Sequence, residues 1–598
     1  MRLWSVIALL LLMLMPGQGM AQSAAPRAPN IILLVADDWG FSDVGAFGAE
    51  FATPHLDRLA YDGVRFSNFH VAGSCAPTRA MLNSGVMNHR NGLGNMAETI
   101  PDAHVGKPNY DTVMNFRVVT LAEMLKAAGY RTYLTGKWHL GSDARRLPHA
   151  RGFDRAFSLA DAGADNFEQK PITGLARHAA WTENGRPATL PKNYYSSRFL
   201  VDQMIGYIDQ GTASGRPFFA SINFLANHIP IQAPDADLAR YRDTYRQGWD
   251  VVRAARAKKV SELGLLPADI PFVHMGTTPD WNGLSDKKRD RAVREMQAYA
   301  AMATAMDREI GRLVAHLKAI GQYENTIILF LSDNGAEPLD PYGKLRNRLF
   351  LSMQLDMKTE NIGRRGTMNA IGPAWASAAV SPLRGYKFSA TEGGLRVPLI
   401  VHWAGAQPSD ALSKGAIAKG FAHVTDIMPT LAELAGVPLP DLTRYAADME
   451  PITGRSLVPM LRGGDDSVHG DAPLGYELSG NAALFRSGYK LVRNLPPTGN
   501  GEWQLYHLAS DPGEVHDLRA AQPTLFQSML ADYQAYAKAN GVLDMPQGYR
   551  ADEQIDLYAM RQQGARPMIA LAVVIGVLAL IVGGGIWLWR RRRARHID

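Results

Sequence analysis

The sequence has 598 residues, of which 46% are hydrophobic and 20% charged, values that exclude a disordered, collagen-like or simple coiled-coil chain. Most of the net charge of +6 lies at the two ends, since residues 590–598 hold five Arg and one Asp, and Arg2 follows the initial Met. About +1 remains for the rest of the chain, so bulk charge does not support a nucleic-acid partner.

The N-terminal segment has the pattern of a cleavable secretion signal. Arg2 precedes an apolar run over 3–15, and Pro16 and small residues ending at Ala21 follow it. The apolar run is too short to span a bilayer comfortably. We therefore expect residues 1–21 to be a signal peptide that engages the secretion machinery; an uncleaved anchor is the alternative.

Two continuous apolar runs, residues 30–36 and 325–331, predict strands that are buried on both faces. Residues 285–320 precede the second run and carry apolar side chains at helical spacing. Shorter alternations of strand and helix patterns fill the rest of this part of the chain. The sequence therefore predicts an α/β fold with a largely parallel sheet.

Each apolar run ends at a polar pair, Asp37-Asp38 in the first case and Asp333-Asn334 in the second. Because sites in parallel sheets form beyond the carboxyl ends of the strands, we expect the two pairs to meet at one edge. Their oxygen donors suit a hard cation such as Ca²⁺ or Mg²⁺ better than Zn²⁺. The alternatives are a helix N-cap for the first pair and a turn for the second.

The only cysteine is Cys75, so the chain cannot form an internal disulfide. Pro77 favours the first turn of a helix that runs to about Ser84 and stops at Gly85. This places Cys75 at a helix N-terminus, where free N–H groups favour an anion, and Arg79 can lie over the same end. The alternative is a small buried apolar residue.

The C-terminal part predicts a second unit and a membrane anchor. Strand patterns over 482–493 and 503–508 and a helix pattern over 523–540 indicate a small α+β subdomain. An uncharged run over 568–589, followed by a basic cluster, is long enough for a bilayer core of ~30 Å. We expect a linker over 546–566, a transmembrane helix over 567–589 and a basic cytoplasmic tail over 590–598, with the catalytic domain anchored on the periplasmic, extracytoplasmic side.

Cys75-x-Pro77-x-Arg79 resembles the sulfatase signature, in which the cysteine is oxidised to formylglycine by a dedicated generating enzyme. Further matches follow in family order over roughly residues 28–545: the second sulfatase signature at 129–141, the active-site His at 227–230, the active-site Lys at 384–387 and the C-terminal motif at 511–518. On these motifs the sequence is identified as a member of the formylglycine-dependent sulfatases of the alkaline-phosphatase-like superfamily. Residues 45–50 and 503–506 are most similar to secreted bacterial calcium arylsulfatases.

The resemblance implies a large mixed, mostly parallel sheet sandwiched by helices over 28–460 and a small antiparallel sheet plus helix over 461–545. It implies Ca²⁺ as the cofactor, with Mg²⁺ as the alternative, and these ligands: Asp37, Asp38, Cys75, Asp333 and Asn334. It implies these catalytic residues: Cys75, Arg79, Lys137, His139, His228, Asp333 and Lys387.

The resemblance also implies the mechanism. A hydroxyl of the hydrated formylglycine at position 75, activated by Asp333, would attack the sulfur of a small sulfate ester. The metal, together with Arg79, Lys137 and Lys387, would stabilise the negative charge of the sulfuryl oxygens. His228 would protonate the leaving group, with help from Lys387, and His139 would take the proton whose loss releases sulfate.

Three alternatives compete with a sulfatase. A phosphonate monoester or phosphodiester hydrolase shares the implied fold, but such relatives typically place a His where this chain has Asn334. A thiolate hydrolase using unmodified Cys75 would leave the four oxygen ligands without a role. A receptor for sulfated ligands that has lost turnover would have no need to keep every predicted ligand and proton donor.

Overall fold

The computed structural model describes residues 28–563 except 173–177, 269, 272, 407–413 and 465–466, and also residues 576, 580 and 583–588. The predicted signal peptide, most of the predicted transmembrane helix and the predicted basic tail therefore lie outside the described residues.

The main body is built on an 11-stranded sheet in the order β10-β2-β9-β8-β1-β7-β3-β4-β5-β6, with β11 beside β2. The central strands β8, β1, β7, β3 and β4 are parallel, and β9 runs antiparallel to β8 and β2. The strands are β1 (Asn30–Ala36), β2 (Val64–His70), β3 (Arg131–Lys137), β4 (Arg155–Leu159), β5 (Trp181–Glu183), β6 (Arg186–Pro187), β7 (Phe218–Asn223), β8 (Thr326–Ser332), β9 (Arg396–Trp403), β10 (Ile417–Ala418) and β11 (Ala422–His423).

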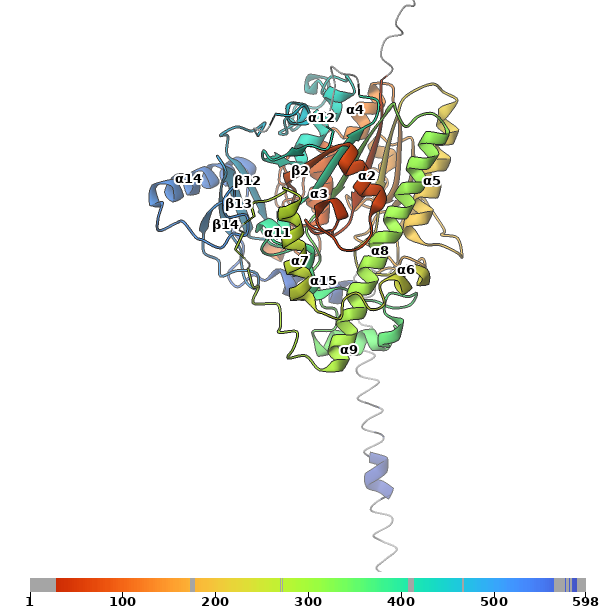
Figure 1. Cartoon of the computed structure of the whole chain (residues 1–598), viewed down its shortest axis with the longest axis vertical. Helices are drawn as coiled ribbons and strands as arrows, with labels where there is room; N and C mark the ends of the chain where they lie inside the picture. Colours follow the sequence, from red (N-terminus) through yellow and green to blue (C-terminus); the bar gives the residue numbers. More distant parts are fainter. Residues whose placement is uncertain are drawn as a thin grey trace, which may run out of the picture.

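Helices cover both faces of this sheet (Figure 1). Those of the main body are α2 (Pro54–Asp62), α3 (Cys75–Ser84), α4 (Leu121–Ala127), α5 (Ser196–Thr212), α6 (Asp235–Arg240), α7 (Trp249–Glu262), α8 (Asp286–Ala319), α9 (Leu345–Ser352), α10 (Gly372–Ala379), α11 (Glu392–Leu395), α12 (Ile427–Leu434) and α13 (Val458–Leu461).

Strand β1 shows why the central runs are apolar throughout. Ile32 and Leu34 pack into the core formed with α2, α5 and α8, whereas Ile31 and Leu33 pack into the core formed with α3, α4 and α12. Successive side chains of a strand point to opposite faces. A strand with a core on each side therefore needs apolar side chains on both faces, not on every second residue. The apolar run that predicts β1 therefore arises because helices cover both faces of the sheet.

A second, antiparallel sheet has the order β12-β13-β14-β15, with strands β12 (Leu474–Leu478), β13 (Asn481–Arg486), β14 (Tyr489–Arg493) and β15 (Gln504–His507). Helix α14 (Pro523–Asn540) covers one of its faces through Met529 and Tyr533. The other face joins the core of the main body, as Tyr476 and Phe485 illustrate. The predicted fold class, an α/β body with a small α+β subdomain, is thus confirmed.

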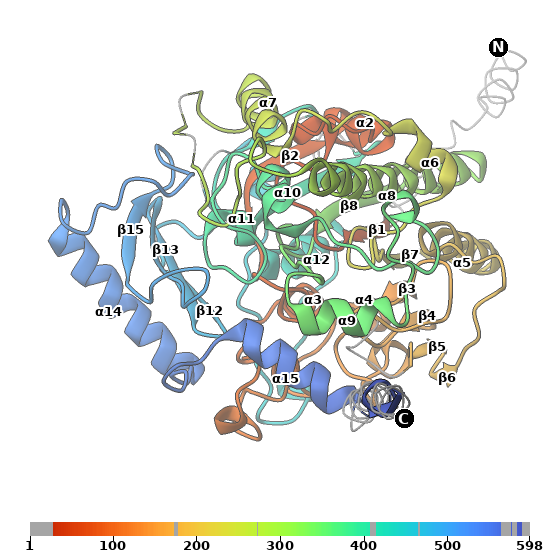
Figure 2. The same cartoon turned by 90° about the horizontal axis from the view of Figure 1, so that it is seen from below.

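The region expected as a linker contains helix α15 (Ala551–Gln563). Lys344, just before α9, pairs with Asp556 of α15 at 2.5 Å, and Arg561 pairs with Asp102 at 3.0 Å. Figure 2 shows α15 lying across the end of the molecule that carries α9. This part of the chain is therefore packed on the main body.

The predicted membrane anchor is corrected by the structure. A span needs about 20 apolar residues in continuous helix, because each backbone polar group must be paired inside the bilayer. Within the described part of the chain, no helix combines that length with that apolar character. This finding overturns the predicted membrane-anchored localisation, which was based on an anchor over 567–589; most of that segment lies outside the described residues.

Candidate active site

The site lies where the parallel strands end. Strands β1 and β8 are adjacent and in register, with Ala36 opposite Ser332, so the polar residues that follow them emerge side by side. The backbone N–H of Asp38 donates to Asp333 Oδ1 at 3.3 Å, and Asn334 Nδ2 donates to Asp38 Oδ1 at 2.6 Å. The sheet thus brings together two pairs that are almost 300 residues apart in the chain, as the spacing predicts.

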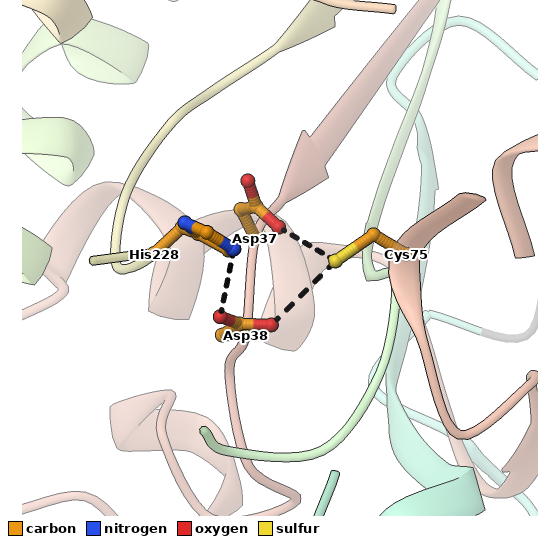
Figure 3. Close-up of side chains that lie close together, drawn as sticks. All are labelled: Asp37, Asp38, Cys75 and His228. Carbon is orange, nitrogen blue, oxygen red and sulfur yellow. Dashed lines mark hydrogen bonds and ion pairs between the residues drawn. The ribbon is translucent and has the colours of Figure 1, made fainter. Parts of the chain in front are cut away.

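Cys75 opens helix α3 and points at the same place. Its Sγ lies 3.4 Å from Asp37 Oδ1 and 3.8 Å from Asp38 Oδ1 (Figure 3). Gly85, with φ of 66°, ends the helix and donates its N–H to Met81 O. Helix α3 therefore has the predicted limits, and its first residue faces the two carboxylates.

The environment of Cys75 does not activate a thiolate. Burial raises the pKa of the thiol well above its usual value, and the negative charge of Asp333 raises it further, although Lys137 acts in the opposite direction. A protonated thiol is a poor nucleophile. The alternative of a hydrolase that uses unmodified Cys75 is therefore disfavoured.

Three buried cations surround the acidic residues. Lys137, at the end of β3, binds both carboxylate oxygens of Asp37 at 2.8 and 2.9 Å. Arg79, one turn into α3, binds Asp333 Oδ2 at 2.7 Å through Nη2. Lys387 is the third.

Lys387 contacts two carboxylates, with Nζ 2.8 Å from Asp38 Oδ1 and 2.9 Å from Glu337 Oε2. Burial would raise the pKa of Asp38, but Lys387 and Lys137 outweigh it and hold that pKa well below its usual range. At Asp37 burial dominates and raises the pKa to about 7, against the effect of Lys137. The cations thus keep Asp38 in its charged form.

His228 lies on the opposite side of Asp38 from Cys75 (Figure 3). Its Nε2 is 3.7 Å from Asp38 Oδ2, and its Nδ1 is 2.8 Å from Ile229 O. Burial lowers the pKa of His228 well below its usual value, and the positive charge of Lys137 lowers it further. The imidazole is therefore neutral at neutral pH, with Nδ1 donating to the carbonyl of Ile229.

Among the described residues, His139 forms its ion pair with Glu98 and none with the carboxylates of this cluster. It follows β3 by two residues, and its Nε2 lies 3.5 Å from Glu98 Oε1. Lys137 and Arg79 are close enough for their charges to lower the pKa of His139. His139 thus lies at the margin of the site and pairs with a residue that the sequence did not indicate.

The residues fit a divalent cation. Asp38 Oδ2 and Asn334 Oδ1 are buried and have no hydrogen-bond partner among the described residues. Ligand atoms of Asp37, Asp38, Cys75 and His228 all lie within 4.8 Å of one another. Carboxylate and amide oxygens are hard donors, and a buried oxygen without a partner is costly unless a cation or donor meets it.

Two functional candidates escaped the sequence analysis, Glu337 and Glu98. Glu337 follows Asn334 by three residues and pairs with Lys387, while Glu98 lies in the loop after α3 and faces His139. Neither belongs to a motif, and carboxylates on loops are common. Only proximity to the sheet edge distinguishes them, and proximity is a property of the fold.

Comparison with known proteins agrees with the motifs. A family model described as Sulfatase matches residues 29–437. An uncharacterized sulfatase of Schizosaccharomyces pombe is 36% identical over 550 residues, which cover 89% of this chain and 97% of that protein. An arylsulfatase of Klebsiella aerogenes is 34% identical over 442 residues, which cover 73% of this chain and 93% of that protein.

Among solved structures, the crystal structure of Ps i-CgsB is similar, with a TM-score of 0.62 and 25% identity over 89% of this chain and 98% of that one. The family model covers well over half of the chain, and both relatives are matched over most of their own length. With the sheet order and the clustered motif residues, these matches lead to one conclusion: the chain belongs to the sulfatase family and is a sulfuric ester hydrolase of the arylsulfatase type.

Proposed function

We propose that the protein cleaves a small sulfate monoester to an alcohol or phenol and inorganic sulfate, with Cys75 matured to formylglycine and Ca²⁺ as the cofactor. The observation that carries the proposal is the convergence of Cys75, three aspartates and three buried cations at one edge of the sheet. The similarity to the arylsulfatase of Klebsiella aerogenes favours aryl sulfates as the substrate class of this protein.

A cation would be held by the oxygen atoms of Asp37, Asp38, Asp333 and Asn334. Its positive charge would orient the sulfuryl oxygens and the nucleophile. Formylglycine supplies a hydrated aldehyde as the nucleophile. Position 75 is suited to it, because its side chain already faces Asp37 and Asp38 at hydrogen-bonding distance.

Arg79, Lys137 and Lys387 would bind the sulfuryl oxygens. All three are buried, so their charges act in a medium of low dielectric constant, where they stabilise developing negative charge strongly. Each is held in place by a carboxylate and loses little conformational freedom when an anion arrives. This preorganisation suits the transfer of a sulfuryl group.

His228 would protonate the leaving oxygen. The imidazole is neutral without substrate, and an anionic sulfate beside it would raise its pKa and favour the protonated form. A histidine whose pKa rises only when substrate binds can stay neutral in the free protein and act as a general acid in the complex.

The test is hydrolysis of 4-nitrophenyl sulfate by protein co-expressed with a formylglycine-generating enzyme, compared with Cys75→Ala. We expect the variant to lose more than about 10³-fold in kcat/KM, because it lacks the nucleophile. Mass spectrometry of the peptide that contains residue 75 establishes whether the aldehyde has formed. A confirmed aldehyde without turnover of any sulfate ester, but with turnover of a phosphonate monoester, would contradict the proposal.

A further inference from the structure

His139 is held in an unusual way at the margin of the site. Its backbone has φ of 56°, a left-handed conformation that is costly for a residue other than glycine. Its side chain is only 15% exposed, and Nε2 faces Glu98 Oε1 at 3.5 Å. The other ring nitrogen, Nδ1, is buried and has no hydrogen-bond partner in the described part of the chain.

We propose that Glu98 is a positioning residue for His139: it holds the ring proton on Nε2 and so leaves the lone pair of Nδ1 free to accept a proton. In neutral histidine one nitrogen donates and the other accepts, and the partner of the first decides the tautomer. The inference rests on the proposed function, because it assigns Nδ1 the proton transfer that accompanies sulfate release.

The charges around this pair support the assignment. Burial would raise the pKa of Glu98, but its pairing with His139 outweighs burial and keeps the pKa below its usual value. Glu98 is therefore ionised at neutral pH and acts as an acceptor. Burial lowers the pKa of His139, Glu98 opposes this, and Lys137 and Arg79 lower it further.

Asp161, on another loop, is a further charged residue near the pair, and its carboxylate accepts the backbone N–H of Ala180 at 2.7 Å. Its interaction with His139 is through charge only, so it does not compete with Glu98 for Nε2. The tautomer of His139 is thus set by one carboxylate.

The loop that carries Glu98 is fixed by the C-terminal segment. Tyr549 donates its hydroxyl proton to Thr99 O at 2.7 Å, and Arg561 of α15 forms a two-bond ion pair with Asp102 at 3.0 Å. Figure 2 shows α15 at this end of the molecule. The loop that presents the Glu98 carboxylate is therefore held by contacts at Thr99 and Asp102, one and four residues further along the chain.

The step concerned is the one that releases sulfate. In this step a proton would pass from the hydroxyl of residue 75 to Nδ1 of His139, while the C–O bond to the sulfate group would break with its electron pair and leave the carbonyl at residue 75. Bond cleavage at the substrate comes earlier and does not need His139. Loss of Glu98 should therefore slow the second half of the reaction and spare the first.

The experiment compares wild type, Glu98→Gln and the control Glu502→Gln, which changes an exposed carboxylate that pairs with Arg519. With 4-nitrophenyl sulfate, we expect Glu98→Gln to lower kcat about 10- to 100-fold, the range for residues that orient a functional side chain. The value of kcat/KM should stay within about 2-fold, and a burst of one nitrophenol per enzyme should precede the slow phase. Glu502→Gln should show neither effect.

A second measurement does not depend on turnover. In the unmodified Cys75 protein, the pKa of His139 followed by NMR should fall in Glu98→Gln, because a negative charge that stabilises the imidazolium has been removed. The same pKa should stay within about 0.3 units in Glu502→Gln, since that side chain is exposed and its charge is screened.

Two results would overturn the inference: an unchanged His139 pKa in Glu98→Gln, or equal losses in kcat and kcat/KM without a burst. The latter would show a structural role for Glu98. If wild type with a confirmed aldehyde releases no nitrophenol, the proposed function fails instead, and the NMR comparison still decides whether Glu98 controls His139.

Discussion

Asp333 makes a different contact through each of its two carboxylate oxygens. Its Oδ2 binds the guanidinium of Arg79, and its Oδ1 accepts the backbone N–H of Asp38, so it connects β8 with both α3 and β1. A carboxylate with one oxygen on an arginine is held in one orientation. The geometry that would present it to a cation is therefore set by Arg79.

We predict that Asp333→Asn loses cation binding and turnover but keeps the fold, because the amide retains the volume and one acceptor. With wild type, added Ca²⁺ should raise Tm; with Asp333→Asn, Tm should not respond. Asp143→Asn, an exposed site whose carboxylate pairs with Arg146, is the control and should behave as wild type. A normal Ca²⁺ response in Asp333→Asn would remove this residue from the ligand set.

His228 gives a second prediction at the residue scale. If it protonates the leaving oxygen, His228→Ala should reduce kcat/KM for alkyl sulfates by about 10²- to 10⁴-fold, because alkoxides are poor leaving groups. Nitrophenolate needs little protonation, so the loss for 4-nitrophenyl sulfate should be about 10-fold or less. Equal losses for both esters would show that His228 has another role.

At the scale of elements, helix α8 supports the start of α2. Asp307 of α8 accepts the backbone N–H groups of His55 and Leu56 at 3.1 and 2.8 Å, which satisfies two donors at a helix N-terminus that lacks a side-chain cap of its own. Burial raises the pKa of Asp307 to about 7, although these two bonds act against the rise. The pair of helices is thus joined by a carboxyl group that titrates near neutrality.

The sign of the resulting pH dependence follows from linkage. The folded state binds the Asp307 proton more tightly than the unfolded state, whose pKa is near 3.8, so this group destabilises the fold as pH rises from about 4 to 7. We expect the free energy of unfolding of wild type, relative to Asp307→Asn, to fall by on the order of 1 to 3 kcal/mol over this range. Urea unfolding of both proteins at pH 5 and 7.5 checks this; a pH-independent difference would contradict it.

At the scale of the molecule, a buried ion network joins the two sheets. Lys490 of β14 lies 2.9 Å from Glu392 in α11 of the main body and 2.9 Å from Glu514, and all three side chains are fully buried. Glu392 also pairs with His70 of β2. The subdomain is therefore attached by charges as well as by the shared apolar core.

We predict that Lys490→Met lowers the free energy of unfolding by about 3–5 kcal/mol, because it leaves Glu514 buried without its cation. Urea unfolding, followed by circular dichroism and tryptophan fluorescence, measures the loss. Lys170→Met, which removes an exposed lysine paired with Glu168, should cost about 1 kcal/mol or less. Losses of similar size in the two variants would show that the buried network does not stabilise the attachment.

Several features of the molecule depend on short stretches of sequence and were therefore predictable. The limits of α3 follow from Pro77 and Gly85, and the strands β1 and β8 follow from runs that are apolar on both faces. Strand β12 and helix α15 carried weaker local patterns and were not predicted. The membrane helix was predicted from hydropathy alone, and no helix among the described residues is long and apolar enough to span a bilayer.

The residue types and their order along the chain were sufficient to place a cysteine at a helix N-terminus and oxygen donors after two strands. The lysines and histidines were named from the resemblance to sulfatase motifs. The pairing of those groups was not predictable, because Lys137 with Asp37, Lys387 with Glu337 and His139 with Glu98 depend on how separate elements pack. Hydrogen bonds and charges act over a few ångströms, and which side chains come that close is set by the order of strands in the sheet and by the loops that leave its edge.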